Sequence, residues 1–475
     1  MYFNSLIFLG FLTTVLLIYP RLRLRGQNDF LLAASYVFYG YWDWRFAFLL
    51  LTSTVVDFWI AQRLQSLEGQ GRRKLLLLIS VTVNLSILGF FKYFNFFLES
   101  TAGVLRTIGF ESHMPLLQIV LPIGISFYTF KTLTYTIDVY RRKITPTGNF
   151  VDYALFLSFF PQLLAGPIDR ASNLLPQISS PRQITREKII SGLNLVLVGY
   201  FKKVAIADTL SPIVSQIFDA PEAMSCGQLW AGVYGYSFQI YGDFSGYTDI
   251  SRGISRILGF ETMENFNSPY LSRSIMEFWR RWHISLSSWL RDYLYIPLGG
   301  NRHGNVRTYT NLMITMSLCG LWHGAAWNFV LWGLLHGLCL AGHRITLRGA
   351  KLDLAWPATI LGWFIQLVKI FVTFHFVTLA WVLFRSPGLD SALVYYQGLF
   401  RLEHLSDFPP SILFAGAMLI ALDVIQTRHG TETWLTGSKN YVPFRYAIVQ
   451  AMLVGILSAS IASLGTLTPF IYFQF

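Results

Sequence analysis

Apolar residues in this chain stand in long continuous blocks, and these blocks limit the folds open to it. A helix that crosses the hydrocarbon core of a bilayer needs about 20 mostly apolar residues, and the blocks suffice for about ten to twelve such helices. Of the 475 residues, 53% are hydrophobic and 13% are charged, and no segment between the blocks is long enough for a soluble domain. The sequence therefore predicts an all-α polytopic membrane protein with one integral-membrane domain over residues 1–475.

The basic residues give the chain a formal net charge of +12, and they gather in short loops between the apolar blocks. In a soluble protein such a charge can indicate nucleic-acid binding. Basic loops beside membrane spans instead mark the cytoplasmic side, so we expect membrane lipid around this chain and no nucleic acid. By this rule residues 72–74, 141–143 and 301–307 face the cytoplasm, and residues 385–410 lie on the opposite side.

The apolar blocks also predict the individual elements. Residues 1–19 are expected to form a first span, and residues 29–63 two short helices joined at the turn YWDWR. Prolines and a glycine interrupt residues 152–170, which we expect to be a re-entrant or interfacial piece. Residues 309–342 have basic loops on both sides, which predicts either two crossings or a re-entrant hairpin. The other predicted crossings cover residues 75–97, 116–140, 189–206, 230–250, 356–383, 412–425 and 446–473.

The stretch CGLWHGAAWNF places His323 in the middle of a long apolar run. An ionisable residue inside a membrane is costly and indicates a functional site, although a histidine packed between helices is the alternative. Gly320 and Gly324 bracket it with a small-xxx-small spacing that lets another backbone approach closely. Trp322 and Trp327 add stiff apolar walls. We therefore take His323 as a candidate catalytic residue.

A second motif, IMEFWRRWHISLSSWLRDYLYI over residues 275–296, predicts one interfacial helix with an aromatic face and a charged face. Its arginines either anchor the helix to anionic lipid or hold an anionic donor such as the phosphates of coenzyme A. His283 lies on the flank between the two faces, where it can point toward a tunnel. The charged face comprises Glu277, Arg280, Arg281, Ser288, Arg291 and Asp292.

The string YGDFSGYTDIS places Asp243 and Asp249 in or beside a span, where carboxylates need partners. Pairing with Arg252 or Arg256 is one interpretation, and polar support for the histidine site is the other. Five histidines lie in residues 283–343, but none has HExxH or another metal-ligand spacing. We expect no metal site and no permanently bound cofactor.

These motifs resemble those of the membrane-bound O-acyltransferase (MBOAT) family, and within it the bacterial branch that O-acetylates alginate. The resemblance implies a helical bundle with re-entrant and interfacial helices around a central tunnel, core motifs over residues 116–343 and helices over residues 356–473 that choose the partner. It matches His323 to the family's signature histidine and His283 to a second position that is usually His, Asn or Asp. Donor-binding or supporting roles are expected for Arg280, Arg281, Arg291, Asp243, Trp322, Trp327 and Asn328. The strings that carry the resemblance are FLSFFPQLLAGPIDR, YSFQIYGDFSGYTDISRGISRILGF, NFNSPYLSRSIMEFWRRWHISLSSWLRDYLYIPLGGNR and LWHGAAWNFVLWGLLHG.

The function implied is an O-acyltransferase that moves an acetyl group from a cytoplasmic thioester, acetyl-CoA or another, across the bacterial inner membrane. The acetyl group would reach an exported polysaccharide, with a periplasmic acetyltransferase as partner. His323 would be the general base, a role worth about 10²–10⁴ in rate, and His283 would orient the donor or stabilise the oxyanion. A proton-coupled transporter using His323 and Asp243 is one alternative, but the inverted repeats typical of that class are missing. A non-catalytic membrane subunit of a polysaccharide secretion complex is the other.

The loop charges predict which residues a membrane-impermeant thiol reagent reaches in intact cells. We expect labelling of Ser406→Cys and none of Asn305→Cys, because only the first lies outside the cytoplasm. The opposite labelling pattern would reverse the orientation.

Overall fold

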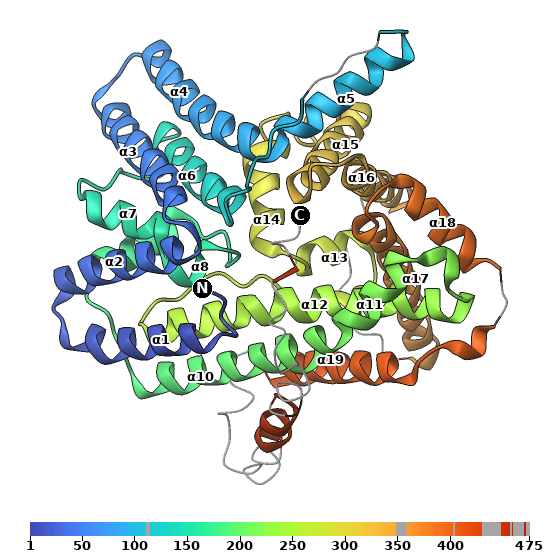
Figure 1. Cartoon of the computed structure of the whole chain (residues 1–475). Helices are drawn as coiled ribbons and strands as arrows, with labels where there is room; N and C mark the ends of the chain where they lie inside the picture. The colour runs from blue at the N-terminus through green and yellow to red at the C-terminus, as the bar shows by residue number, and fades with distance from the viewer. Residues whose placement is uncertain are drawn as a thin grey trace. The chain divides into compact units, whose positions relative to one another are not determined.

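The computed structural model describes residues 1–110, 115–347, 359–401, 404–429, 448–456, 458 and 470–471 (Figure 1). Every regular element in these residues is helical, as the sequence predicts. Among them, four helical stretches are long and apolar enough to cross a membrane, and two shorter apolar helices cover Leu6–Arg21 and Pro410–Gln426. The expected total of about ten to twelve crossings and the central tunnel stay predictions. The four stretches are Arg45–Ser66, Gln70–Thr107, Arg186–Asp219 and Ile360–Arg385.

The chain divides into two compact units. The first unit contains Met1–Gly192 and Ser251–Met263, and the second contains Leu193–Ile250 and Glu264–Phe475. Helices α10 (Arg186–Tyr200) and α12 (Cys226–Ile257) contribute residues to both.

The first unit confirms the turn predicted at YWDWR, because α2 ends at Asp43 and α3 begins at Arg45. The Asp43 carboxylate accepts hydrogen bonds from the backbone and the side chain of Arg45 there. A π-helical turn over Gly89–Tyr93 joins α4 to α5. The complete helices of this unit are α1 (Leu6–Ile18), α2 (Leu24–Asp43), α3 (Arg45–Ser66), α4 (Gln70–Leu88), α5 (Phe94–Thr107), α6 (Ile125–Tyr140), α7 (Phe150–Ser158), α8 (Phe160–Leu163) and α9 (Ala171–Ser179).

The predicted helix over residues 116–140 is wrong in its first part, because α6 begins only at Ile125. Gly124 precedes it with φ at 80°, a left-handed conformation that glycine adopts without steric cost. A Cβ at this position would lie 2.7 Å from the carbonyl oxygen of Leu163, so the close approach also requires glycine. Residues 152–170 are broken between α7 and α8, as predicted, and residues 152–169 are buried in protein. Their place in the membrane stays a prediction.

A buried carboxylate connects three helices of the first unit. Asp57 on α3 is fully buried, and it accepts hydrogen bonds from Ser80 and Asn84 on α4 and from Thr132 on α6. A buried charge is costly unless hydrogen bonds replace its hydration. These neutral donors therefore fix the relative positions of α3, α4 and α6.

The second unit contains the predicted hairpin of residues 309–342. Helices α15 and α16 pack side by side (Figure 1). His323 is the last residue of α15. The predicted crossings near 356 and over 446–473 lie partly outside the described residues. The remaining helices of this unit are α11 (Thr209–Asp219), α13 (Ile275–Arg281), α14 (Ile284–Leu290), α15 (Gly304–His323), α16 (Trp327–Leu347), α17 (Ile360–Arg385), α18 (Leu389–Leu399) and α19 (Pro410–His429), with a π-helical stretch over Phe201–Asp208.

Glycines bring α15 and α16 into backbone contact. A Cβ at Gly320 would overlap the carbonyl oxygen of Phe329, and one at Gly333 would overlap that of Met316. Close approach through small residues is how helices in a membrane gain packing energy, since lipid offers no hydrophobic driving force between them. The turn that carries His323 is held by this contact.

We expect Gly333→Ala to destabilise the protein, because the added methyl group forces the two helices apart. The expected loss is about 1–3 kcal/mol, the usual cost of overpacking. Thermal unfolding of the purified protein in detergent measures it. Gly342→Ala on the same helix is the matched control, since nothing lies within 4 Å of a Cβ there. Equal melting temperatures for the two variants would contradict the close contact.

Candidate functional site

The structure brings the two predicted histidines together. The ring centroids of His283 and His323 lie 6.4 Å apart, and the side chains are 0% and 3% exposed. His323 ends α15 at the hairpin turn, and His283 lies between α13 and α14. Two buried imidazoles within reach of one reacting group have the arrangement expected of an acid–base site.

The single interfacial helix predicted over residues 275–296 is wrong. The segment forms α13, α14 and a π-helical turn over Arg291–Tyr295, with a break at His283. His283 has φ at 43°, in the left-handed region that non-glycine residues rarely adopt. The two faces deduced from a continuous helix therefore do not exist, and Glu277, expected on the charged face, is 2% exposed.

Hydrogen bonds to a non-helical backbone segment around Asn265 and Asn267 hold this break in place. The Ile284 amide donates to the carbonyl oxygen of Asn265 at 2.9 Å, and the Asn267 amide donates to that of Arg281 at 3.0 Å. The Ser285 amide donates to the Asn265 side chain at 3.2 Å. Strained backbone persists where surrounding structure determines it, and it concentrates at functional sites.

Aromatic rings surround both histidines. The rings of Trp322, Trp332 and Phe384 lie 5.0 to 5.4 Å from that of His323. Phe244 lies 4.7 Å from the His283 ring, and Trp322 lies 5.8 Å from it. Trp322 thus lies beside both histidines, and its supporting role stays a prediction.

Burial changes the charge state of His283, which lies outside the four candidate membrane-spanning helices. Removal from water disfavours the charged imidazolium and lowers the pKa of His283 from 6.5 to about 3. The ring is therefore neutral at physiological pH.

The predicted arginines have different surroundings. Arg281 donates to the Glu277 carboxylate at 2.8 Å and to the carbonyl oxygen of Asn267 at 3.2 Å, so it supports the local fold. Arg291 is mostly exposed and pairs with Asp292 at 2.8 Å. Arg280 is exposed, with one guanidinium nitrogen 3.8 Å from the Met276 sulfur.

Lysines are partners of the two carboxylates in YGDFSGYTDIS. The ammonium of Lys203 lies 2.7 Å from Asp243, and that of Lys202 lies 2.9 Å from Asp249. Both lysines are almost fully buried. Asp243 also accepts a hydrogen bond from the backbone amide of Ile471 at 2.6 Å.

The other two predicted supporting residues are Asn328, which is buried, and Trp327, which is exposed. Asn328 is buried and donates to the carbonyl oxygens of Leu383 and Ser386 at 3.1 and 2.8 Å, which fixes the end of α17. Trp327 begins α16 and is 53% exposed.

Sequence reasoning missed Trp332 and His336. The Trp332 ring contacts His323 and lies 4.7 Å from the ring of His336, which is fully buried. Neither ring nitrogen of His336 has a hydrogen-bond partner in the part of the chain that is described. The signal for both residues was the second half of the string LWHGAAWNFVLWGLLHG, whose first half carries His323. Among the described residues, no group of three or more His, Cys, Asp or Glu side chains could hold a metal ion.

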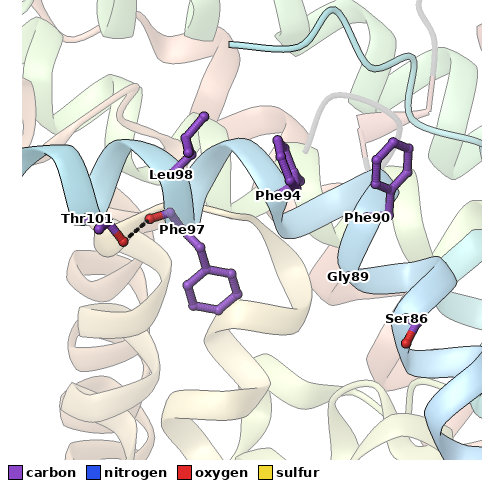
Figure 2. A pocket seen from close by; sticks show the side chains of 7 residues that line it. All are labelled: Ser86, Gly89, Phe90, Phe94, Phe97, Leu98 and Thr101. Carbon is purple, nitrogen blue, oxygen red and sulfur yellow. Dashed lines mark hydrogen bonds between the residues drawn. The ribbon is translucent and has the colours of Figure 1, made fainter. Parts of the chain in front are cut away.

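A pocket of about 570 Å³ in the first unit lies along α4, the π-helical turn and α5 (Figure 2). Three of its seven lining residues are phenylalanines, and none of the seven titrates. It offers no group for acid–base chemistry. Its lining residues are Ser86, Gly89, Phe90, Phe94, Phe97, Leu98 and Thr101.

Residues 75–384, which include both histidines and the hairpin, match the model of the membrane-bound O-acyltransferase family. The chain belongs to this family. The enzyme is 44% identical to a probable alginate O-acetylase AlgI of Azotobacter vinelandii, over 84% of this chain and 78% of that protein. It is 37% identical to a protein of the same description from Pseudomonas putida, over the full length of both. A peptidoglycan O-acetyltransferase of Helicobacter pylori is 37% identical, over 85% of this chain and 80% of its own.

The low pKa of His283 predicts how the stability of this acyltransferase depends on pH. Above pH 6.5 the ring is neutral in both the folded and the unfolded protein. Between pH 6.5 and about 3 only the unfolded chain binds the proton, so stability falls as the pH falls. The slope from this one group is at most about 1.4 kcal/mol per pH unit.

Unfolding at pH 7.5, 6.0 and 5.0 tests this dependence. We expect His283→Asn to show a flatter loss of stability toward acid, since asparagine does not titrate and tolerates the left-handed backbone. The control is His303→Asn, because His303 is exposed. Parallel pH curves for wild type and His283→Asn would contradict the buried neutral ring.

Proposed function

We propose that this acyltransferase takes an acetyl group from a cytoplasmic thioester, acetyl-CoA or another, and delivers it across the bacterial inner membrane for O-acetylation of an exported polysaccharide. The observation that carries the proposal is the pair of buried histidines in a chain of this family. The names of the relatives, alginate O-acetylase and peptidoglycan O-acetyltransferase, favour acetyl as the acyl group and a glycan as the final acceptor.

His323 acts as the general base in this proposal. The acceptor hydroxyl loses its proton to the imidazole while its oxygen attacks the thioester carbonyl, and the thiolate of the donor leaves. The proton then passes from the imidazolium to the thiolate, which restores the base. Rings of Trp322, Trp332 and Phe384 line His323, and such an apolar wall protects the thioester from hydrolysis by excluding water.

His283 orients the donor. A centroid separation of 6.4 Å is too long for a hydrogen bond between the two rings. One carbonyl or hydroxyl group between the rings bridges that distance. A neutral His283 can donate a hydrogen bond to the thioester carbonyl oxygen, where negative charge develops in the transition state.

Arg280 is the best candidate to meet the phosphates of a coenzyme A donor. It is exposed, whereas Glu277 holds Arg281 and Asp292 pairs with Arg291. The acceptor side requires a glycan hydroxyl, supplied directly or through a periplasmic acetyltransferase. The bacterial origin of the three relatives supports the inner membrane as the location.

A donor titration on the purified protein in lipid, with its acceptor supplied, tests how the histidines divide the work. We expect His323→Ala to show no transfer at any donor concentration, because loss of the base removes a transition-state interaction. We expect His283→Ala to retain some activity and to require more donor for half-saturation, because loss of a donor contact raises the apparent Michaelis constant.

Membrane accumulation of both variants is the control for folding. Wild-type transfer by His323→Ala would remove this residue from the mechanism and favour a non-catalytic subunit. Equal loss of turnover in both variants, with unchanged half-saturation, would show that the histidines act as one catalytic unit.

A further inference from the structure

Two residues far along the chain dock beside the histidine site. Phe470 and Ile471 belong to the second unit and are 2% and 3% exposed. The Ile471 backbone amide donates a 2.6 Å hydrogen bond to one carboxylate oxygen of Asp243, which is 228 positions earlier in the sequence. A hydrogen bond to a charged acceptor is stronger than one between neutral groups, and more so away from water.

Asp243 is held rigidly enough to act as an anchor. Its other carboxylate oxygen lies 2.7 Å from the ammonium of Lys203, and the same ammonium lies 2.7 Å from Asp208. The side chains of all three residues are largely buried. The ion pair with Lys203 compensates the buried charge of Asp243. The bond to Ile471 is a separate contact, because it uses the other oxygen.

Phe470 extends this anchor toward the histidines. Its ring stacks on Tyr247 with centroids 4.6 Å apart and lies 5.5 Å from that of Phe244. The Phe244 ring in turn lies 4.7 Å from the His283 ring. A short series of contacts therefore runs from the Asp243 carboxylate through Ile471, Phe470 and Phe244 to His283.

We propose that Asp243 is a positioning residue that holds Phe470 and Ile471 as one wall of the histidine site. It acts through the Ile471 amide and contacts neither donor nor acceptor. This role rests on the proposed function. The sequence predicts a supporting role for Asp243, and the bond to Ile471 is the contact through which that support acts. The wall keeps the aromatic rings beside His283 in place, so its loss weakens the contact of His283 with the donor and raises the apparent Michaelis constant for the donor.

Kinetics of a double-mutant cycle test the bond. Asp243→Ala removes the acceptor, and Ile471→Pro removes the amide hydrogen, while Ile471→Val keeps that hydrogen and is the matched control. We expect each of the first two variants to lose about tenfold to a hundredfold in kcat/KM, chiefly through a higher Michaelis constant for the donor, and Ile471→Val to resemble wild type. The double variant should be as active as the less active of the two single variants, because both substitutions remove the same contact.

Asp208→Ala is the control for the ion pair, since it removes a second carboxylate partner of Lys203 without touching Ile471. The fold-loss of activity in a variant with both Asp208→Ala and Ile471→Pro should equal the product of the two single losses, because the substitutions remove different contacts. Asp243→Asn should regain most of the activity that Asp243→Ala loses, because an amide oxygen still accepts the bond. If the variant with both Asp243→Ala and Ile471→Pro instead lost activity by the product of the two single losses, the proposal would be overturned.

Thiol labelling separates this proposal from the function itself. In protein whose three native cysteines are replaced by alanine, Ile471→Cys keeps the backbone amide and reports whether the segment is docked. We expect faster labelling when Asp243→Ala is added, and no change with Asp208→Ala. This result without any acetyl transfer by wild-type protein would uphold the docking and refute the proposed function. Unchanged labelling with Asp243→Ala would refute the docking, whatever the enzyme transfers.

Discussion

The position of His323 depends on the backbone contact between α15 and α16. The carbonyl oxygens of Phe329 and Met316 occupy the places where Cβ atoms of Gly320 and Gly333 would be, so neither glycine can carry a side chain without separating the helices. The turn between the two helices is fixed as a result. Because His323 is the last residue of α15, its ring is presented at this turn among Trp322, Trp332 and Phe384.

Buried charges shape the rest of the protein, because each of them needs a partner in an apolar interior. In the first unit, Asp57 obtains neutral donors from two neighbouring helices. In the second unit, Lys203 and the Ile471 amide serve Asp243. Glu277 binds Arg273 and Arg281 in the same way beside the break at His283. Arg281, for which the sequence suggests donor binding, therefore holds the site in shape, whereas Arg280 and Arg291 are exposed to solvent.

The histidine site combines a backbone frame fixed by close contacts with two buried imidazoles. Burial keeps His283 uncharged, and a neutral imidazole can donate or accept a proton without first shedding one to water. The left-handed backbone at His283 places this ring between two short helices, whereas His323 comes from the end of a long one. Two rings supplied by independent elements can face one group from different sides.

The helical membrane class, the turn at YWDWR and the hairpin around residue 323 follow from the sequence alone. The sequence also singles out both histidines as candidate site residues. Hydropathy and motif spacing are local properties of the sequence, so they can be read without knowledge of the fold. Only the tertiary structure decided that α6 begins at Ile125, that His283 interrupts a helix, and that Lys203 and Ile471 meet Asp243. The break at His283 depends on the backbone of Asn265 and Asn267, and the Asp243 contact joins residues 228 positions apart. A periodic pattern reports only on residues that are near neighbours in the chain. Contacts between residues far apart in the sequence form only when distant segments fold together, so no local pattern predicts them.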